Sequence, residues 1–164
     1  MSLNQPFDPN YTTYDFEVIR EDWNEYELLD ATRLRAKLVL TKILRRRTTP
    51  PSMYEILGTA VVVANSDSQR RHPPTQLTPQ EMASLNTPGP SDMKIPVEVA
   101  VSSERWNQYR ITQTDEVLRV KLILIDVYRI PDHYDDTGEQ MYHVATGNIV
   151  APLPQRDGSQ RLTP

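Results

Sequence analysis

The chain repeats itself, and this repetition constrains its fold more than any other feature of the sequence. Residues 23–26 (WNEY) match residues 106–109 (WNQY) at an offset of 83 (106 − 23), and these segments contain both tryptophans of the chain. Residues 34–40 (LRAKLVL) match residues 118–124 (LRVKLIL) at an offset of 84 (118 − 34). Segments that match in the same order predict an internal duplication, and a missed repeat would misassign the whole fold.

Shorter matches extend the two copies. Arg45 corresponds to Arg129 at an offset of 84 (129 − 45), and Tyr54 corresponds to Tyr142 at 88 (142 − 54). Upstream, the segment FEVI at 16–19 resembles the segment VEVA at 97–100, an offset of 81 (97 − 16). The predicted organisation is a flexible N-terminal tail (1–14), a first β repeat (15–65), a proline-rich linker (66–94), a second β repeat (95–154) and a flexible C-terminal tail (155–164).

Each predicted repeat consists of short segments that are rich in β-branched residues and bounded by turn residues, which is the pattern of β-strands. The longest runs, 33–45 and 117–129, are apolar on both faces in the middle and charged at their ends, as expected for a bent strand that passes between two sheets. A helix over 33–47 is the alternative, because its leucines can also form one helical face. The β-branched residues of the second run favour the strand: Val120, Ile123, Ile125 and Val127.

These features predict a mostly β fold of one globular domain. A unit of about 50 residues buries too little apolar surface to be stable alone, so the two repeats are expected to pack with pseudo-twofold symmetry into a small antiparallel barrel or sandwich. The linker carries one predicted helix at 79–86. Thr78 is a suitable N-cap, Pro79 suits the first helical position, and Glu81 completes a capping box.

Composition excludes several classes of protein. The chain has 164 residues and no cysteine, so a disulfide framework or a cysteine metal site is impossible. The sequence lacks a signal peptide and any apolar run of membrane-spanning length, which predicts a cytoplasmic protein without a membrane partner. It also lacks the glycine-rich, HExxH and GxSxG motifs, so neither a cofactor nor an enzymatic activity is expected. The net charge of −4 disfavours a general nucleic-acid binder.

The first candidate site is a basic and aromatic stripe that occurs once in each repeat. Arg35 and Lys37 lie two positions apart, so they share one face of a strand, and strand faces that combine cations with aromatic rings bind single-stranded nucleic acids. The alternative is that these cations pair with acids on the neighbouring strand, Glu25 and Glu27. The candidate residues, for nucleic acid or another partner, are Trp23, Tyr26, Arg35, Lys37, Arg45, Trp106, Tyr109, Arg119, Lys121 and Arg129.

The second candidate site is the acidic loop after the second long run. Its oxygen ligands are dense enough to suggest Ca²⁺ or Mg²⁺, although the spacing is not that of an EF-hand and an ordinary solvated turn is the alternative. The candidate ligands are Asp132, Asp135, Asp136 and Glu139. In the first repeat the equivalent loop is basic. Arg45–Arg47 and Arg70–Arg71 are expected to lie together at one end of the fold.

The sequence therefore favours a non-enzymatic interaction or assembly module built on a duplicated β unit. Its expected partner is a protein, including a second copy of itself, contacted through the loops at 46–53 or 131–140. Two alternatives remain open: a nucleic-acid-binding β-barrel that uses the basic and aromatic stripe, and a small-molecule or metal-binding enzyme.

Overall fold

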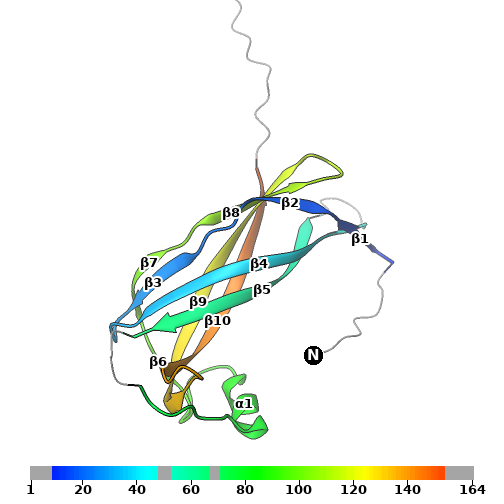
Figure 1. The fold of residues 1–164 in the computed structure, drawn as a ribbon. Coiled ribbons are helices and arrows are strands. Elements are labelled where there is room, and N and C mark those ends of the chain that lie inside the picture. The colour runs from blue at the N-terminus through cyan, green and yellow to red at the C-terminus, as the bar shows by residue number, and fades with distance from the viewer. Residues whose placement is uncertain (1–8, 48–52, 67–70, 154–164) are drawn as a thin grey trace, which may run out of the picture.

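Two antiparallel sheets of five strands each form most of the computed structural model, which describes residues 9–47, 53–66 and 71–153 (Figure 1). The first sheet contains β1 (Tyr11–Tyr14), β3 (Asn24–Leu28), β4 (Arg33–Arg46), β5 (Tyr54–Asn65) and β7 (Val99–Ser103). The second sheet contains β2 (Phe16–Arg20), β6 (Ile95–Pro96), β8 (Trp106–Ile111), β9 (Val117–Tyr134) and β10 (Gln140–Pro152). The mostly β prediction is confirmed, whereas a closed barrel is not formed by the described residues.

The order of strands shows that the chain passes between the sheets five times: after β1, β2, β5, β6 and β7. In the first sheet the order is β5-β4-β3-β7, with β1 paired to the far half of β4, and in the second it is β10-β9-β8-β2, with β6 paired to β9. β2 therefore lies in the second sheet although the next strand, β3, lies in the first. Conversely, β7 lies in the first sheet although the next strand, β8, lies in the second. Each sheet thus receives one strand from the other half of the chain.

The registers of the two sheets agree closely. Tyr26 lies opposite Leu34, and Tyr109 lies opposite Leu118. The β4–β5 ladder has a register shift between Leu40 and Lys42 of β4. The β9–β10 ladder has one between Leu124 and Asp126 of β9, and each of these residues lies 84 positions after its counterpart in β4.

The expected match of residues 16–19 with residues 97–100 is two positions out. Phe16 lies opposite Ile111, and Val99 lies opposite Leu28. The structural counterpart of Phe16 is therefore Val99, at an offset of 83 (99 − 16). The short FEVI and VEVA segments resemble each other through alternation alone, and alternation is preserved when a strand slips by two residues.

The long runs are strands rather than helices, as the β-branched residues indicated. The single helix of the described residues, α1 (Pro79–Leu85), begins with the predicted capping box: the backbone N–H of Glu81 donates to Thr78 Oγ1 at 3.2 Å, and the Thr78 N–H donates to Glu81 Oε2 at 2.8 Å. No helix among these residues has the length and apolar character to cross a membrane.

Two boundaries differ from expectation. Tyr11–Tyr14, expected in the flexible tail, form β1 and pair with residues 43–46; residues 1–8 and 155–164 lie outside the described residues. β9 continues through Pro131 to Tyr134, where a loop was expected. A bulge makes this possible: Asp132 has a φ of 59°, and the Gln140 amide donates to the carbonyls of Ile130 and His133.

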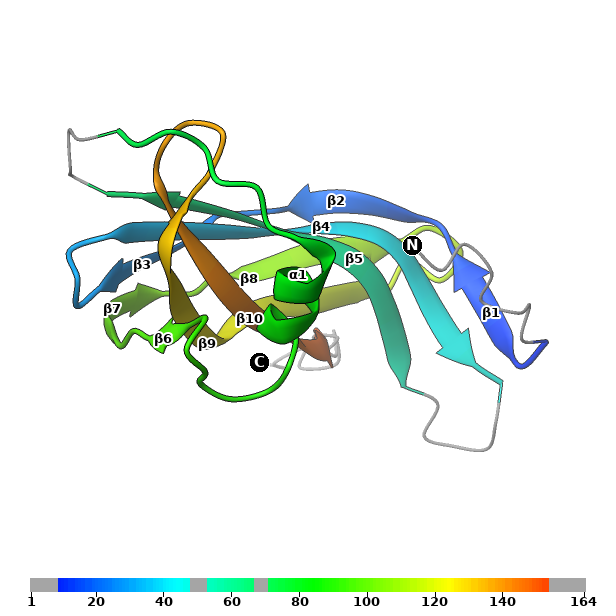
Figure 2. The ribbon, with the colours of Figure 1, turned by 90° about the horizontal axis from the view of Figure 1, so that it is seen from below.

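The core lies between the two sheets and is formed by alternate residues of the long strands. Leu34, Leu38 and Ile43 of β4 are buried there, as are Leu118 and Leu122 of β9. Burial of such side chains stabilises the fold by about 1.5–3 kcal/mol each. Figure 2 shows β4 and β5 curving together toward the end of the molecule where β1 lies.

Candidate functional site

The basic stripe is engaged within the chain. The guanidinium carbon of Arg35 lies 4.6 Å from the ring centroid of Trp23, and that of Arg119 lies 4.9 Å from the ring centroid of Trp106. Each arginine therefore lies over its own tryptophan in a cation–π contact. Because a base must stack on an open aromatic face, these rings are less suited to nucleic acid than the sequence indicated.

The lysines of the stripe form ion pairs. Lys37 Nζ lies 3.6 Å from Glu21 Oε2, and Lys121 Nζ lies 3.9 Å from Glu104 Oε2. Glu21 lies in the crossing from β2 to β3, and Glu104 lies in the crossing from β7 to β8. Glu25, predicted to lie near the stripe, is directly opposite Arg35. Lys37, Lys121 and Arg35 thus have acids of the same molecule beside them.

Tyr26 and Tyr109 do not belong to this surface. They are 2% and 0% exposed, because successive strand residues face opposite sides and the tyrosines point into the core. Their hydroxyls donate to Glu104 and Glu21 respectively, each at 3.1 Å. Burial raises the pKa of both phenols far above the ordinary value. These residues are structural anchors rather than contacts for a partner.

Arg45 and Arg129 are also separated from the stripe. The bulge in each long strand reverses which face its later residues occupy, so Arg45 lies opposite Tyr54 and Arg129 lies opposite Tyr142. Arg45 lies over the Tyr54 ring, 5.2 Å from its centroid. Arg45 and Arg129, which were candidates together with the stripe, therefore lie on the other face of their strands.

The acidic loop binds its own backbone. Asp135 Oδ1 accepts hydrogen bonds from the N–H of Thr137 at 2.8 Å, its hydroxyl at 2.6 Å, and the N–H of Glu139 at 3.1 Å. Burial opposes ionisation of Asp135, but these hydrogen bonds outweigh it and lower the pKa of the carboxyl. Among residues 9–47, 53–66 and 71–153, no group of three or more histidine, aspartate and glutamate side chains is arranged to hold a metal ion.

Glu139 has partners in the linker. Its carboxylate forms an ion pair with Arg71 and accepts a hydrogen bond from the N–H of Ser66 at 3.3 Å. Arg71 consequently lies at the acidic loop, and the expectation that it lies with Arg45–Arg47 is wrong. The two arginine groups lie apart because β5 runs antiparallel to β4. It returns the chain from the end of β4 that holds Arg45 to the end that holds Arg33. Arg70 and residues 48–52 lie outside the described residues.

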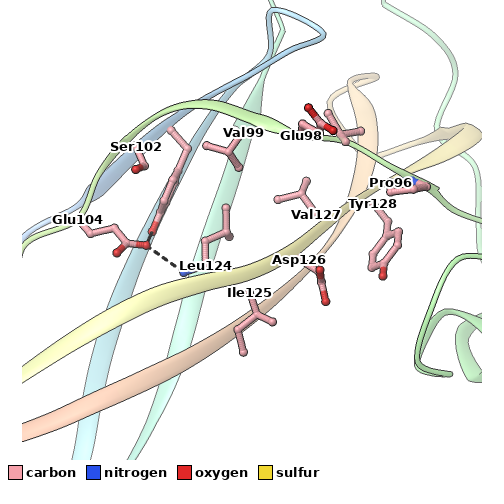
Figure 3. A pocket seen from close by; sticks show the side chains of 12 residues that line it. Pro96, Glu98, Val99, Ser102, Glu104, Leu124, Ile125, Asp126, Val127 and Tyr128 are labelled. Atoms are coloured by element: carbon pink, nitrogen blue, oxygen red, sulfur yellow. Dashed lines mark hydrogen bonds between the residues drawn. The ribbon is translucent and has the colours of Figure 1, made fainter.

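A hollow of about 520 Å³ lies between residues 96–104 and β9 (Figure 3). Val99, Leu124 and Val127 line it together with Tyr26, and Glu104 lies at its border. At the matching place on the other side, Phe16 packs edge-on against Tyr109, with the ring centroids 5.6 Å apart. Val99 pairs with Leu28 as Phe16 pairs with Ile111, and its side chain is smaller than that of Phe16.

Lys94 is an important residue that the sequence did not reveal. It is 2% exposed, and its ammonium group donates to the carbonyl of Leu85, the last residue of α1, and to that of Thr87. The ammonium nitrogen also lies 4.8 Å from the centroid of the Tyr128 ring. Lys94 thus fastens the linker helix to the second sheet, and no local pattern distinguishes it from an exposed lysine.

The outer edge of β5 is the most unusual surface of the fold. Within the described residues β5 pairs only with β4, so one of its sides carries unpaired backbone groups. From Ile56 to Asn65 the strand holds no charged residue. Val61, Val62 and Val63 are 41%, 36% and 40% exposed, although they point alternately to opposite faces. This edge was missed because the sequence could not show which strands lie at the sides of the sheets.

The other edges differ from β5. β2 carries Glu17 and Arg20, charges of the kind that discourage edge-to-edge pairing. β7 is uncharged, but it is only five residues long, and its pairing with β3 shifts register between Glu27 and Leu28 of β3. β10 is long but holds His143, Gly147 and Asn148 along its length. Only β5, among the described edges, is long, apolar and rich in β-branched residues.

Comparison with known proteins gives no family for this chain. No family model matches the sequence, and neither the curated proteins nor the solved structures contain a significant match to it.

Proposed function

We propose that this protein is a non-enzymatic interaction module that binds an extended protein segment along the β5 edge. The observation that carries the proposal is the exposed edge of β5, which holds no charged residue from Ile56 to Asn65. Proteins usually protect such edges with charges, proline or a covering segment. An edge without these protections suits strand addition, in which backbone hydrogen bonds provide affinity and alternate side chains provide selectivity.

The outer face beside this edge indicates what a bound segment should contain. Val63 lies opposite Arg35, and Val61 lies opposite Lys37. A segment added to β5 would place its outward side chains against the valines, with the cations one strand further away. Apolar, β-branched outward residues therefore fit best.

We also propose that the two halves of the chain arose by duplication. Support comes from contacts that recur 83 or 84 positions apart, including the arginine–tryptophan pairs and the bulges in the long strands. In this proposal the β5 edge is a feature of one half alone, because its counterpart β10 is more polar.

The absence of cysteine supports a cytoplasmic location.

The test of edge binding uses a fluorescein-labelled peptide with the sequence of residues 54–65 and the full-length protein. Fluorescence anisotropy should show saturable binding, which Val62→Lys should weaken at least tenfold. Ile149→Lys on the β10 edge is the matched control, because Ile149 is similarly exposed at 45%. Absence of binding, or equal binding by all three proteins, would exclude strand addition at β5.

A nucleic-acid-binding surface is the second candidate. The observation in its favour is that each sheet carries one arginine–tryptophan pair next to a lysine. It ranks below the first proposal because the arginines cover the tryptophan rings and the lysines have acidic partners. A titration described in the Discussion tests it.

A further inference from the structure

We propose that the β5 edge binds the β5 edge of a second copy, in antiparallel register and with the twofold axis at Val62. This inference rests on the proposed function and names its partner. The pairing would join the first sheets of the two molecules into one continuous sheet. It is an isologous contact, so it closes at two subunits.

The register follows from where β5 is straight. The ladder with β4 shifts between Leu40 and Lys42, opposite Gly58 and Leu57, and a bulge bends both strands at that point. The backbone is crowded there, since a Cβ on Gly58 would lie 2.8 Å from the carbonyl oxygen of Val39. Residues 58 to 65 remain in unbroken register with β4. Past the crowded Gly58, the seven residues from 59 to 65 are centred on Val62.

Antiparallel pairing about this midpoint is self-complementary. Val62 lies opposite Val62 of the second copy, and Val61 lies opposite the second copy's Val63. Cross-strand pairs of β-branched residues are favourable, and the uncharged segment places no like charges in contact.

Charges on the neighbouring strand do not oppose this contact. Arg35 lies opposite Val63, and Lys37 lies opposite Val61. After pairing, Arg35 of one copy and Lys37 of the other are separated by three strand spacings, about 14 Å. The Debye length at physiological ionic strength is about 8 Å, so their repulsion is largely screened.

On the inner face of the β5 edge, the structure also favours contact with Val62 of the second copy. Val62 and Ala64 border a hollow of about 240 Å³ that Met141 and Val144 also line. The second copy's Val62, directly opposite on the same face, would lie over this hollow and reduce its exposed apolar surface. The contact is smaller than the roughly 800 Å² per partner of a standard interface. We therefore expect a weak, concentration-dependent dimer.

Disulfide trapping tests the register, because the chain has no cysteine of its own. Opposed residues in an antiparallel pair have Cα atoms about 4.5–5.5 Å apart, which is within the range of a disulfide. Val62→Cys should form a disulfide-linked dimer under mild oxidation. Thr59→Cys is the control, since the two copies of Thr59 would lie about 20 Å apart. Equal cross-linking of both variants, or cross-linking of neither, overturns the proposed register.

Sedimentation of the unlabelled protein tests the dimer. Between about 1 and about 300 µM, the mean molecular mass of the wild type should rise toward that of two chains. Val62→Lys and Val61→Lys should both stay monomeric with unchanged circular dichroism, and Ile149→Lys should behave as the wild type. A monomeric wild type that still binds the labelled peptide overturns this inference alone. A monomeric wild type that binds no peptide overturns the proposed function as well.

Discussion

Glu21 and Glu104 make the same set of contacts on opposite sides of the core. Each carboxylate accepts a hydrogen bond from a buried tyrosine hydroxyl at 3.1 Å, from Tyr109 in one case and from Tyr26 in the other. Each also accepts a backbone N–H at a bulge, that of Leu40 or that of Leu124. Glu21 lies in the segment that joins β2 to β3, and Glu104 lies in the segment that joins β7 to β8. Each glutamate therefore attaches its segment to a tyrosine of the core.

Removing either carboxylate should destabilise the protein. Glu21→Ala and Glu104→Ala each leave a buried hydroxyl without its acceptor, and we expect each to lower the free energy of unfolding by about 2 kcal/mol. Glu17→Ala is the control, because this side chain is 68% exposed and its ion pair with Arg110 spans 3.9 Å. Urea denaturation measures all three. Equal stability of the variants would contradict a structural role for the buried glutamates.

Filling the hollow beside Tyr26 should stabilise the fold. Val99→Phe places a ring beside Tyr26, much as Phe16 packs against Tyr109 on the other side, and we expect a gain of about 1 kcal/mol in the free energy of unfolding. The converse change, Phe16→Val, should cost about 1–3 kcal/mol. Thermal denaturation of both variants checks the pair of effects. A loss of stability in Val99→Phe would mean that the hollow cannot accept a ring.

Replacing Lys94 should loosen the linker helix. Lys94→Met keeps the volume of the side chain but leaves the carbonyls of Leu85 and Thr87 without their donor, at an expected cost of about 2–3 kcal/mol. Hydrogen exchange should show faster exchange in α1, while the β3–β4 ladder remains protected. Unchanged exchange in α1 would show that the lysine does not hold the helix.

Stability should fall at mildly acidic pH through His143. Burial, and then the positive charge of Lys94, lower the pKa of His143 below its usual 6.5. The unfolded state therefore binds more protons in this range, so His143 contributes stability that is present above about pH 6.5 and is lost as the pH falls through the folded-state pKa. His143→Gln should flatten the dependence of unfolding free energy on pH between about 5 and 7. An NMR titration should place the histidine pKa nearer 6.5 in Lys94→Met.

Single-stranded nucleic acid should bind weakly if the arginine–tryptophan pairs are structural. A titration with a labelled oligothymidylate at 50 mM salt is expected to give a dissociation constant weaker than about 100 µM. The double variant Arg35→Glu/Lys121→Glu is the control for any binding that appears. Tight binding that weakens steeply with salt and disappears in this variant would instead support the nucleic-acid-binding alternative.

The sequence predicted the elements better than their arrangement. The β-branched residues of the second long run correctly favoured a strand, and Thr78 with Glu81 correctly placed the start of α1, because both signals are local. The exchange of β2 and β7 between sheets has no local signal. It depends on pairings such as Phe16 with Ile111, which no spacing in the sequence reveals.

The candidate residues were predicted less well. The expectation that Glu25 and Glu27 lie across from the basic residues of the next strand is confirmed by the β3–β4 register, but a bulge of one residue moved Arg45 to the other face. Tyr26 and Tyr109 were included among the candidate partner contacts, although a large apolar anchor is their simplest interpretation from the sequence, and the structure buries both in the core. The β5 edge was missed because exposure of a strand depends on its neighbours in the sheet rather than on its own residues.

The crossing of strands between the sheets has a consequence for synthesis on the ribosome. Phe16 pairs with Ile111, 95 positions later (111 − 16), and Glu25 pairs with Ser103, 78 positions later (103 − 25). Neither sheet can be completed until most of the chain has been translated, and pairings of such high contact order form slowly. During that delay the nascent β5 segment, which carries no charge from Ile56 to Asn65, is exposed. The geometry that stabilises the finished molecule therefore leaves its emerging N-terminal half dependent on rapid completion of translation.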